Sequence, residues 1–198
     1  MDTPESLSRQ VGIIADDLTS AADGAGPFLP WAGSARVHRG AAGLAGRGVL
    51  YKTLDSTLRG HVRAELATAL RASGRRLLVV APAFPAAGRV TRGGIQYVHG
   101  ERVDASVYAA DPVHPARTAR LLDLIDPAIG PARVVPEDAD AAQLRDAARQ
   151  ARTLVLDATT QAALDERVAQ LWTYGSCLWA GSPGMAGALA ARCGAAAA

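Results

Sequence analysis

Short runs of apolar residues alternate with longer stretches that place apolar side chains at helical spacing. Runs of this length are typical of strands buried on both faces, and the stretches between them are typical of amphipathic helices. The predicted strands are 11–15, 35–38, 49–53, 77–81, 133–135, 153–156 and 177–180. The predicted helices are 19–28, 61–73, 117–125, 140–150, 160–174 and 185–192. This alternation predicts an α/β fold, with an open, mostly parallel sheet and helices on both faces.

Residues 92–103 have a different pattern, with short extended runs on either side of His99 and Gly100. This pattern predicts a small β-hairpin insertion in the α/β fold. The 198 residues suit one domain, which we place at 11–193. The polar residues 1–10 are expected to be a flexible N-terminus, and the alanine-rich residues 194–198 a disordered tail.

The composition excludes several classes of protein. Hydrophobic residues make up 49% and charged residues 20%, as in an ordinary globular protein, and a net charge of +2 is too small to indicate nucleic-acid binding. No signal peptide or membrane span is evident, which predicts a cytoplasmic location without membrane contact. Neither the histidines nor the cysteines, Cys177 and Cys193, have the spacing of metal ligands, so we expect no metal.

Polar residues gather where the predicted strands end. Since the carboxyl ends of parallel strands share one edge of a sheet, ligands bind in the crevice along that edge. The candidate residues follow five strands along the chain, and we expect them to converge there. They are Asp16 and Asp17 as the predicted catalytic pair, and Asp55, Ser56, Arg59, Arg89, Gly181 and Ser182 as predicted substrate-binding residues.

Each acidic candidate has a second interpretation. One member of the Asp16–Asp17 pair can cap the following helix, or it can hydrogen-bond a sugar hydroxyl and take its proton. Asp55 and Ser56 are equally typical of a capped helix start with an exposed arginine. Alternatively, Arg59 can clamp a carboxylate with two parallel hydrogen bonds.

The glycine- and proline-rich candidates also leave two interpretations open. The loop 82–94 can be a stiff crossover, or it can present Arg89 and main-chain amides to an anion. Gly181 and Ser182 can allow close helix packing, or they can form an anion-binding helix N-terminus. The sequence has no glycine-rich phosphate loop ending in Lys-Ser or Lys-Thr, and residues 24–26 match a dinucleotide fingerprint poorly.

Five stretches, in this order, resemble the N-terminal domain of the four-carbon acid sugar kinases, the family of threonate, erythronate and 3-oxo-tetronate kinases. They are GIIADDLTSAAD, YKTLDSTLRGHVRAEL, VVAPAFPAAGR, ADPVHP and AGSPGMAGALA, and the resemblance extends from about Gly12 to Ala190. It implies a domain that binds a small hydroxy acid or sugar acid for phosphorylation by ATP. In that family's pattern the arginines hold the carboxylate, and one of the two aspartates, Asp16 or Asp17, orients or deprotonates the hydroxyl.

Members of that family are longer, and their glycine-rich ATP-binding half has no counterpart in this sequence. The stretch between Asp23 and Val49 is also shorter and lacks an Asp-Ser-Arg segment. We therefore expect no cofactor bound by this chain alone, with ATP and Mg²⁺ brought by a separate nucleotide-binding subunit, and no autonomous kinase activity. A homodimer is a second expected assembly. The alternatives are an ATP-independent enzyme and a non-catalytic binding or partner subunit for a small hydroxy acid.

Overall fold

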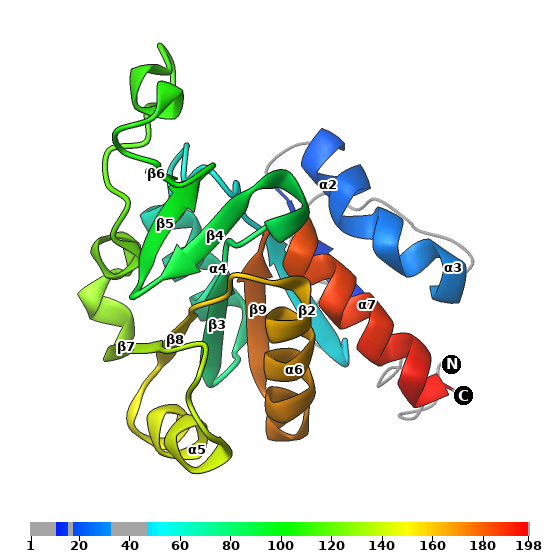
Figure 1. The fold of residues 1–198 in the computed structure, drawn as a ribbon. Helices are drawn as coiled ribbons and strands as arrows, with labels where there is room; N and C mark the ends of the chain where they lie inside the picture. The colour runs from blue at the N-terminus through cyan, green and yellow to red at the C-terminus, as the bar shows by residue number, and fades with distance from the viewer. Residues whose placement is uncertain (1–10, 16–17, 33–46, 198) are drawn as a thin grey trace.

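The computed structural model describes residues 11–15, 18–32 and 47–197. Its centre is a six-stranded sheet in which all neighbouring strands run parallel, in the order β1-β2-β9-β3-β8-β7 (Figure 1). The strands are β1 (Val11–Ile14), β2 (Val49–Thr53), β3 (Leu77–Ala81), β7 (Ala132–Val135), β8 (Thr153–Leu156) and β9 (Cys177–Gly181). The predicted α/β class with a mostly parallel sheet is confirmed.

Helices cover both faces of this sheet, because side chains that alternate along each strand are buried on both sides. In β3, Leu78 and Val80 belong to the core under α4 (Val62–Ser73), whereas Leu77 and Val79 belong to the opposite core. The opposite face carries α5 (Ala141–Gln150), α6 (Gln161–Leu171) and α7 (Pro183–Ala197) (Figure 1). Beside α7 lie α2 (Leu18–Ala25), η1 (Gly26–Phe28) and α3 (Leu29–Ala32).

A small antiparallel sheet stands at the carboxyl edge of the main sheet. It consists of β4 (Arg89–Arg92), β5 (Ile95–Val98) and β6 (Glu101–Arg102). A bridge between Thr91 and Ala158 attaches it just beyond the end of β8, and Val98 is buried in the core under α4. The predicted hairpin is therefore confirmed, with β4 as an additional strand that the sequence pattern does not reveal.

The predicted helix at 117–125 is wrong. Only a single 3-10 turn forms there, η5 (Leu121–Leu124). The preceding residues are extended because they pair with the small sheet: Ala119 O accepts from Gln96 N at 2.9 Å, and Leu121 N donates to Gly94 O at 2.9 Å. Tertiary pairing therefore outweighs the local helical spacing of the apolar residues. The other 3-10 turns are η3 (Pro85–Ala87), η4 (Val107–Ala110), η6 (Pro127–Ile129) and η7 (Trp172–Tyr174).

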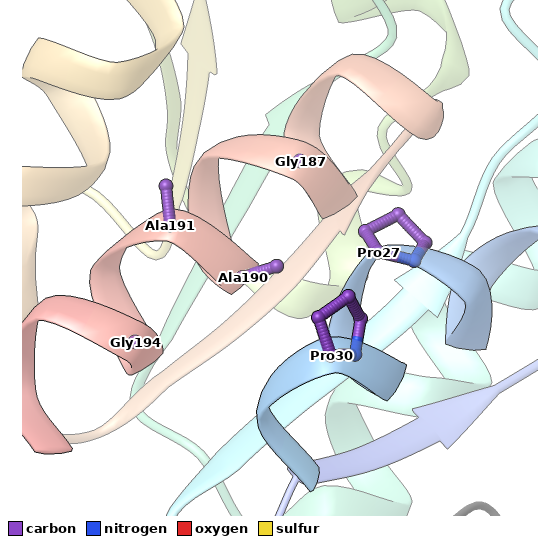
Figure 2. Close-up of a pocket in the computed structure, with 6 residues that line it drawn as sticks. All are labelled: Pro27, Pro30, Gly187, Ala190, Ala191 and Gly194. Carbon is purple, nitrogen blue, oxygen red and sulfur yellow. The ribbon is translucent and has the colours of Figure 1, made fainter. Parts of the chain in front are cut away.

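Helix α7 extends through Ala197 and so includes most of the segment predicted to be a disordered tail. Alanine has the highest helix propensity, which explains the extension. Small residues on α7 and two prolines leave an open apolar pocket of about 480 Å³, lined by Pro27, Pro30, Gly187, Ala190, Ala191 and Gly194 (Figure 2). The predicted strand at 35–38 and the N-terminal residues 1–10 lie outside the described residues.

Candidate functional site

The loop that follows β2 is folded around the carboxylate of Asp55. Asp55 Oδ1 accepts hydrogen bonds from Thr57 N at 2.9 Å and from Thr57 Oγ1 at 2.8 Å. The turn then passes through a left-handed residue, Leu58, with φ of 58°, and through Gly60, with φ of 94°. Asp55 therefore shapes the loop that carries Ser56 and Arg59, but it does not cap a helix, because α4 begins only at Val62 and has no side-chain cap.

Arg59 is surrounded by carboxylates of the protein itself. Its Nε lies 2.7 Å from Asp55 Oδ2, and its Nη1 lies 3.0 Å from Asp111 Oδ2. Partial burial lowers the pKa of Arg59, but the hydrogen bonds and charges of Asp55 and Asp111 outweigh that effect and raise the pKa. In this structure Arg59 clamps two internal carboxylates, and its predicted role in binding a substrate carboxylate stays a prediction.

Arg89, the first residue of β4, has a different environment. Its Nη1 donates to Ser56 Oγ at 2.6 Å and its Nη2 donates to the Tyr108 hydroxyl at 3.2 Å, so both acceptors are neutral. Its Nε is buried, and none of the described residues accepts a hydrogen bond from it. Within the described ranges, none of the ion pairs includes Arg89. Its positive charge is therefore available to an anion.

Ser56 is fixed from the side of the small sheet. The fully buried Gln96 donates from Nε2 to Ser56 O at 2.8 Å, and its Oε1 accepts from Thr91 Oγ1 at 2.7 Å. Ser56 itself is only 3% exposed. The acceptor that orients Arg89 is thus part of a rigid, buried network, and the predicted residues Asp55, Ser56, Arg59 and Arg89 do converge.

Gly181 and Ser182, at the end of β9, are buried between strand and helix. Ser182 Oγ donates to Ala83 O and accepts from Gly184 N at 3.1 Å. A Cβ on Gly181 would collide with Ala81 O. The structure thus places both residues in the close packing of α7 against the end of β3, and their contact with a substrate stays a prediction. The predicted catalytic residues Asp16 and Asp17 lie outside the described residues.

The structure adds two residues that the strand-end pattern does not reveal. Tyr108, on η4, lies with its ring centroid 5.5 Å from Arg59 Cζ and 5.6 Å from Arg89 Cζ. Asp111 follows η4 and accepts from His114 N, Val113 N and Arg59, and these hydrogen bonds lower its pKa. Both residues lie well apart in the sequence from Arg59 and contact it only through the tertiary fold. The signal for Asp111 was its place in the ADPVHP stretch.

Lys52 is a further residue of this edge that the sequence reasoning missed. It is only 4% exposed, and its Nζ lies 2.9 Å from Glu65 Oε2 on α4 and 2.6 Å from Thr53 O. A lone charged residue inside a strand of apolar residues was the available signal. This buried pair fastens the end of β2, and hence the following loop, to α4.

Asp157 directly follows β8 and lies at the same carboxyl edge of the main sheet. Its two carboxylate oxygens accept from Gly93 N at 2.7 Å and Gly94 N at 2.8 Å. Burial raises the pKa of Asp157, and these two hydrogen bonds only partly oppose the rise. Asp157 thereby holds the turn between β4 and β5.

Throughout the described part of the chain, no three His, Cys, Asp or Glu side chains are grouped as metal ligands, and no helix is both long and apolar enough to cross a membrane.

Comparison with known families shows to which family the chain belongs. Residues 31–189 match the family described as the sugar-binding N-terminal domain. The chain belongs to this family. Relatives of this sugar-binding domain include the D-threonate kinase of Cupriavidus necator, 40% identical over 156 residues, and that of Bordetella bronchiseptica, 36% identical over 143 residues. The matches cover 73% and 71% of this chain but only 36% and 35% of those proteins.

Solved structures share this fold. A Bordetella bronchiseptica protein, described as a domain of unknown function with bound citrate and as a domain-swapped dimer, matches with a TM-score of 0.76 and 28% identity. That match covers 95% of this sugar-binding domain and 57% of the other chain. A Haemophilus influenzae protein with 19% identity and a TM-score of 0.74 has the same fold.

Proposed function

We propose that this domain binds the carboxylate of a four-carbon hydroxy acid, such as D-threonate, at Arg89. The observation that carries the proposal is the guanidinium of Arg89, whose two Nη atoms donate to neutral acceptors and which forms no ion pair with any of the described residues. A carboxylate is the natural complement of such a group, because it accepts charge-assisted hydrogen bonds in the plane of the guanidinium. The relatives named D-threonate and D-erythronate kinases favour a four-carbon acid.

Arg89 is a better anchor for a carboxylate than Arg59. A ligand at Arg59 must compete with the carboxylates of Asp55 and Asp111, which already hold its Nε and Nη1. A ligand at Arg89 meets no such competitor among the described ion pairs. Because Ser56 and Tyr108 fix the two Nη atoms of Arg89, little side-chain freedom is lost on binding.

We further propose that the bound acid is the acceptor for a phosphoryl group, as the kinase names of the relatives suggest. In this proposal Asp16 or Asp17 orients or deprotonates the acceptor hydroxyl. ATP and Mg²⁺ are held by a separate nucleotide-binding unit. Positioning and electrostatics provide most of the catalysis in phosphoryl transfer, so a rigid carboxylate anchor would be this domain's main contribution.

Calorimetric titration with D-threonate, and with the neutral polyol threitol, tests the carboxylate proposal. We expect binding of the acid only. R89Q, which removes the charge, should weaken binding by about 10- to 100-fold, the size expected for lost hydrogen bonds to a charged group. R92Q is the matched control, since Arg92 lies on the same strand and is exposed. Equal binding of threonate by R89Q and R92Q would contradict the proposal.

A further inference from the structure

An excursion of the chain, which we call the arm (residues 104–116), connects the small sheet to the site. Figure 1 shows that the segment after β6 extends away from the body of the fold. The arm is closed on itself, because Ala116 N donates to Tyr108 O at 2.9 Å. Its base is tied to the fold by Ala119 N, which donates to Asp104 Oδ2 at 2.9 Å.

The arm touches the site through polar and aromatic groups. Asp111 binds Arg59, and the ring of His114 meets that of His61 edge to face, with centroids 5.3 Å apart. The apolar side chains Val107 and Val113 are instead 80% and 72% exposed. The arm's contact with the site therefore depends on Tyr108 and its polar neighbours, not on these two valines.

Tyr108 faces two cations at once. The Cζ atoms of Arg59 and Arg89 lie 5.5 and 5.6 Å from its ring centroid, and both distances are within the range of cation–π attraction. Two guanidiniums close to one ring repel each other, so each needs a partner that fixes it. Arg59 has Asp55 and Asp111, whereas Arg89 pairs with no carboxylate of the described residues and depends on Ser56, on the Tyr108 hydroxyl and on the ring.

We propose that Tyr108 is a positioning residue for the anion site. Its ring sets the spacing of the two guanidiniums, and its hydroxyl fixes Nη2 of Arg89, so that the guanidinium of Arg89 is held in one orientation for the carboxylate of the acid. This inference rests on the proposed function, because it assumes that Arg89 binds the acid. It assigns part of the recognition of the acid to the arm, which is separate from the loop after β2 that carries Arg59 and from the strand β4 that carries Arg89.

Variants at Tyr108 separate the contribution of its ring from that of its hydroxyl. Y108F keeps the ring and loses the hydroxyl, and we expect about threefold weaker binding of D-threonate, as for one modest hydrogen bond. Y108L also loses the ring, and we expect about tenfold or greater weakening, as for the loss of partly buried cation–π contacts. V107T is the matched control on the arm and should bind like the unaltered chain.

The thermal midpoint without ligand is measured in parallel, and the affinity loss should greatly exceed what any change in midpoint explains. Should Y108L not fold, pentafluorophenylalanine at position 108 gives the same contrast against Y108F, because fluorination reverses the ring's charge distribution at similar shape. Y108W should recover part of the affinity lost in Y108L.

Three results would contradict the inference, and they are distinguishable. If R89Q abolishes binding while Y108L, or the fluorinated variant where Y108L does not fold, binds the acid like the unaltered chain, Tyr108 has no positioning role and the proposed function stands. If the unaltered chain binds no acid, the proposed function fails and this inference fails with it. An equal loss in Y108F and Y108L would also contradict the role assigned to the ring.

Discussion

The buried Lys52–Glu65 pair gives an asymmetric prediction. Lys52 lies in β2 with its side chain 5% exposed, whereas the side chain of Glu65 on α4 is 29% exposed. We compare K52M with E65M, two changes to the same apolar residue. Removing the lysine leaves a carboxylate that water can reach. Removing the glutamate leaves a buried ammonium whose remaining hydrogen-bond acceptor among the described residues is Thr53 O.

The magnitudes follow from this difference in burial. Breaking a buried ion pair by removing one partner costs about 3–5 kcal/mol when the other charge stays buried. We expect E65M to cost about 3 kcal/mol, at the low end because Glu65 is partly solvated, and K52M to cost about 1–2 kcal/mol, mainly the donor lost by Thr53 O. Because K52M removes the stranded ammonium, the double variant K52M/E65M should be more stable than E65M alone.

Urea unfolding of the two single variants and the double variant measures these free energies. R63M is the matched control, since Arg63 is exposed on α4, and it should change the free energy of unfolding by less than about 0.5 kcal/mol. The reasoning is refuted if K52M costs more than E65M, or if the double variant loses the sum of the two single changes.

Two further predictions concern packing and pH. A Cβ at Gly184 would lie 2.7 Å from Ala83 O, so G184A should destabilise the fold by about 1–3 kcal/mol. A Cβ at Gly187 meets nothing within 4 Å, so the control G187A should not destabilise the fold. Equal melting temperatures for the two variants would contradict this prediction. The amide hydrogen bonds and Arg59 hold the pKa of Asp111 below its ordinary value of 3.8. The stability that Asp111 contributes is therefore present above that value and lost as pH falls through the lowered pKa. The difference in free energy of unfolding between the unaltered chain and D111N should stay constant from neutral pH to about pH 5 and shrink below about pH 4; a difference that grows toward acid pH would contradict it.

The strands of the main sheet could be predicted well from sequence, since a strand buried on both faces must be a short, continuous apolar run. Residues 49–53 and 77–81 are observed with the predicted bounds. The helix predicted at 117–125 is wrong because tertiary pairing, not the local pattern, determines the backbone there. The apolar spacing there is helical, but the backbone is drawn into pairing with β5, which no local pattern reveals.

In the site, too, the sequence predicts which residues come together but not the contacts that the tertiary fold adds. Asp55, Ser56, Arg59 and Arg89 could be placed together because they follow strands whose ends share one edge. What could not be predicted is how their charges are balanced. Asp111 on the arm pairs with Arg59, whereas Arg89 has no carboxylate partner among the described residues, and this difference depends on where an excursion of the chain returns in space.

A crystal structure of this chain with bound D-threonate tests the central claim most directly. The account predicts a carboxylate oxygen of the acid about 2.7–3.2 Å from a guanidinium nitrogen of Arg89, the range of an ordinary hydrogen bond, with Arg59 still paired to Asp55 and Asp111. A carboxylate bound away from Arg89, or held by Arg59 after displacement of Asp111, would contradict the account.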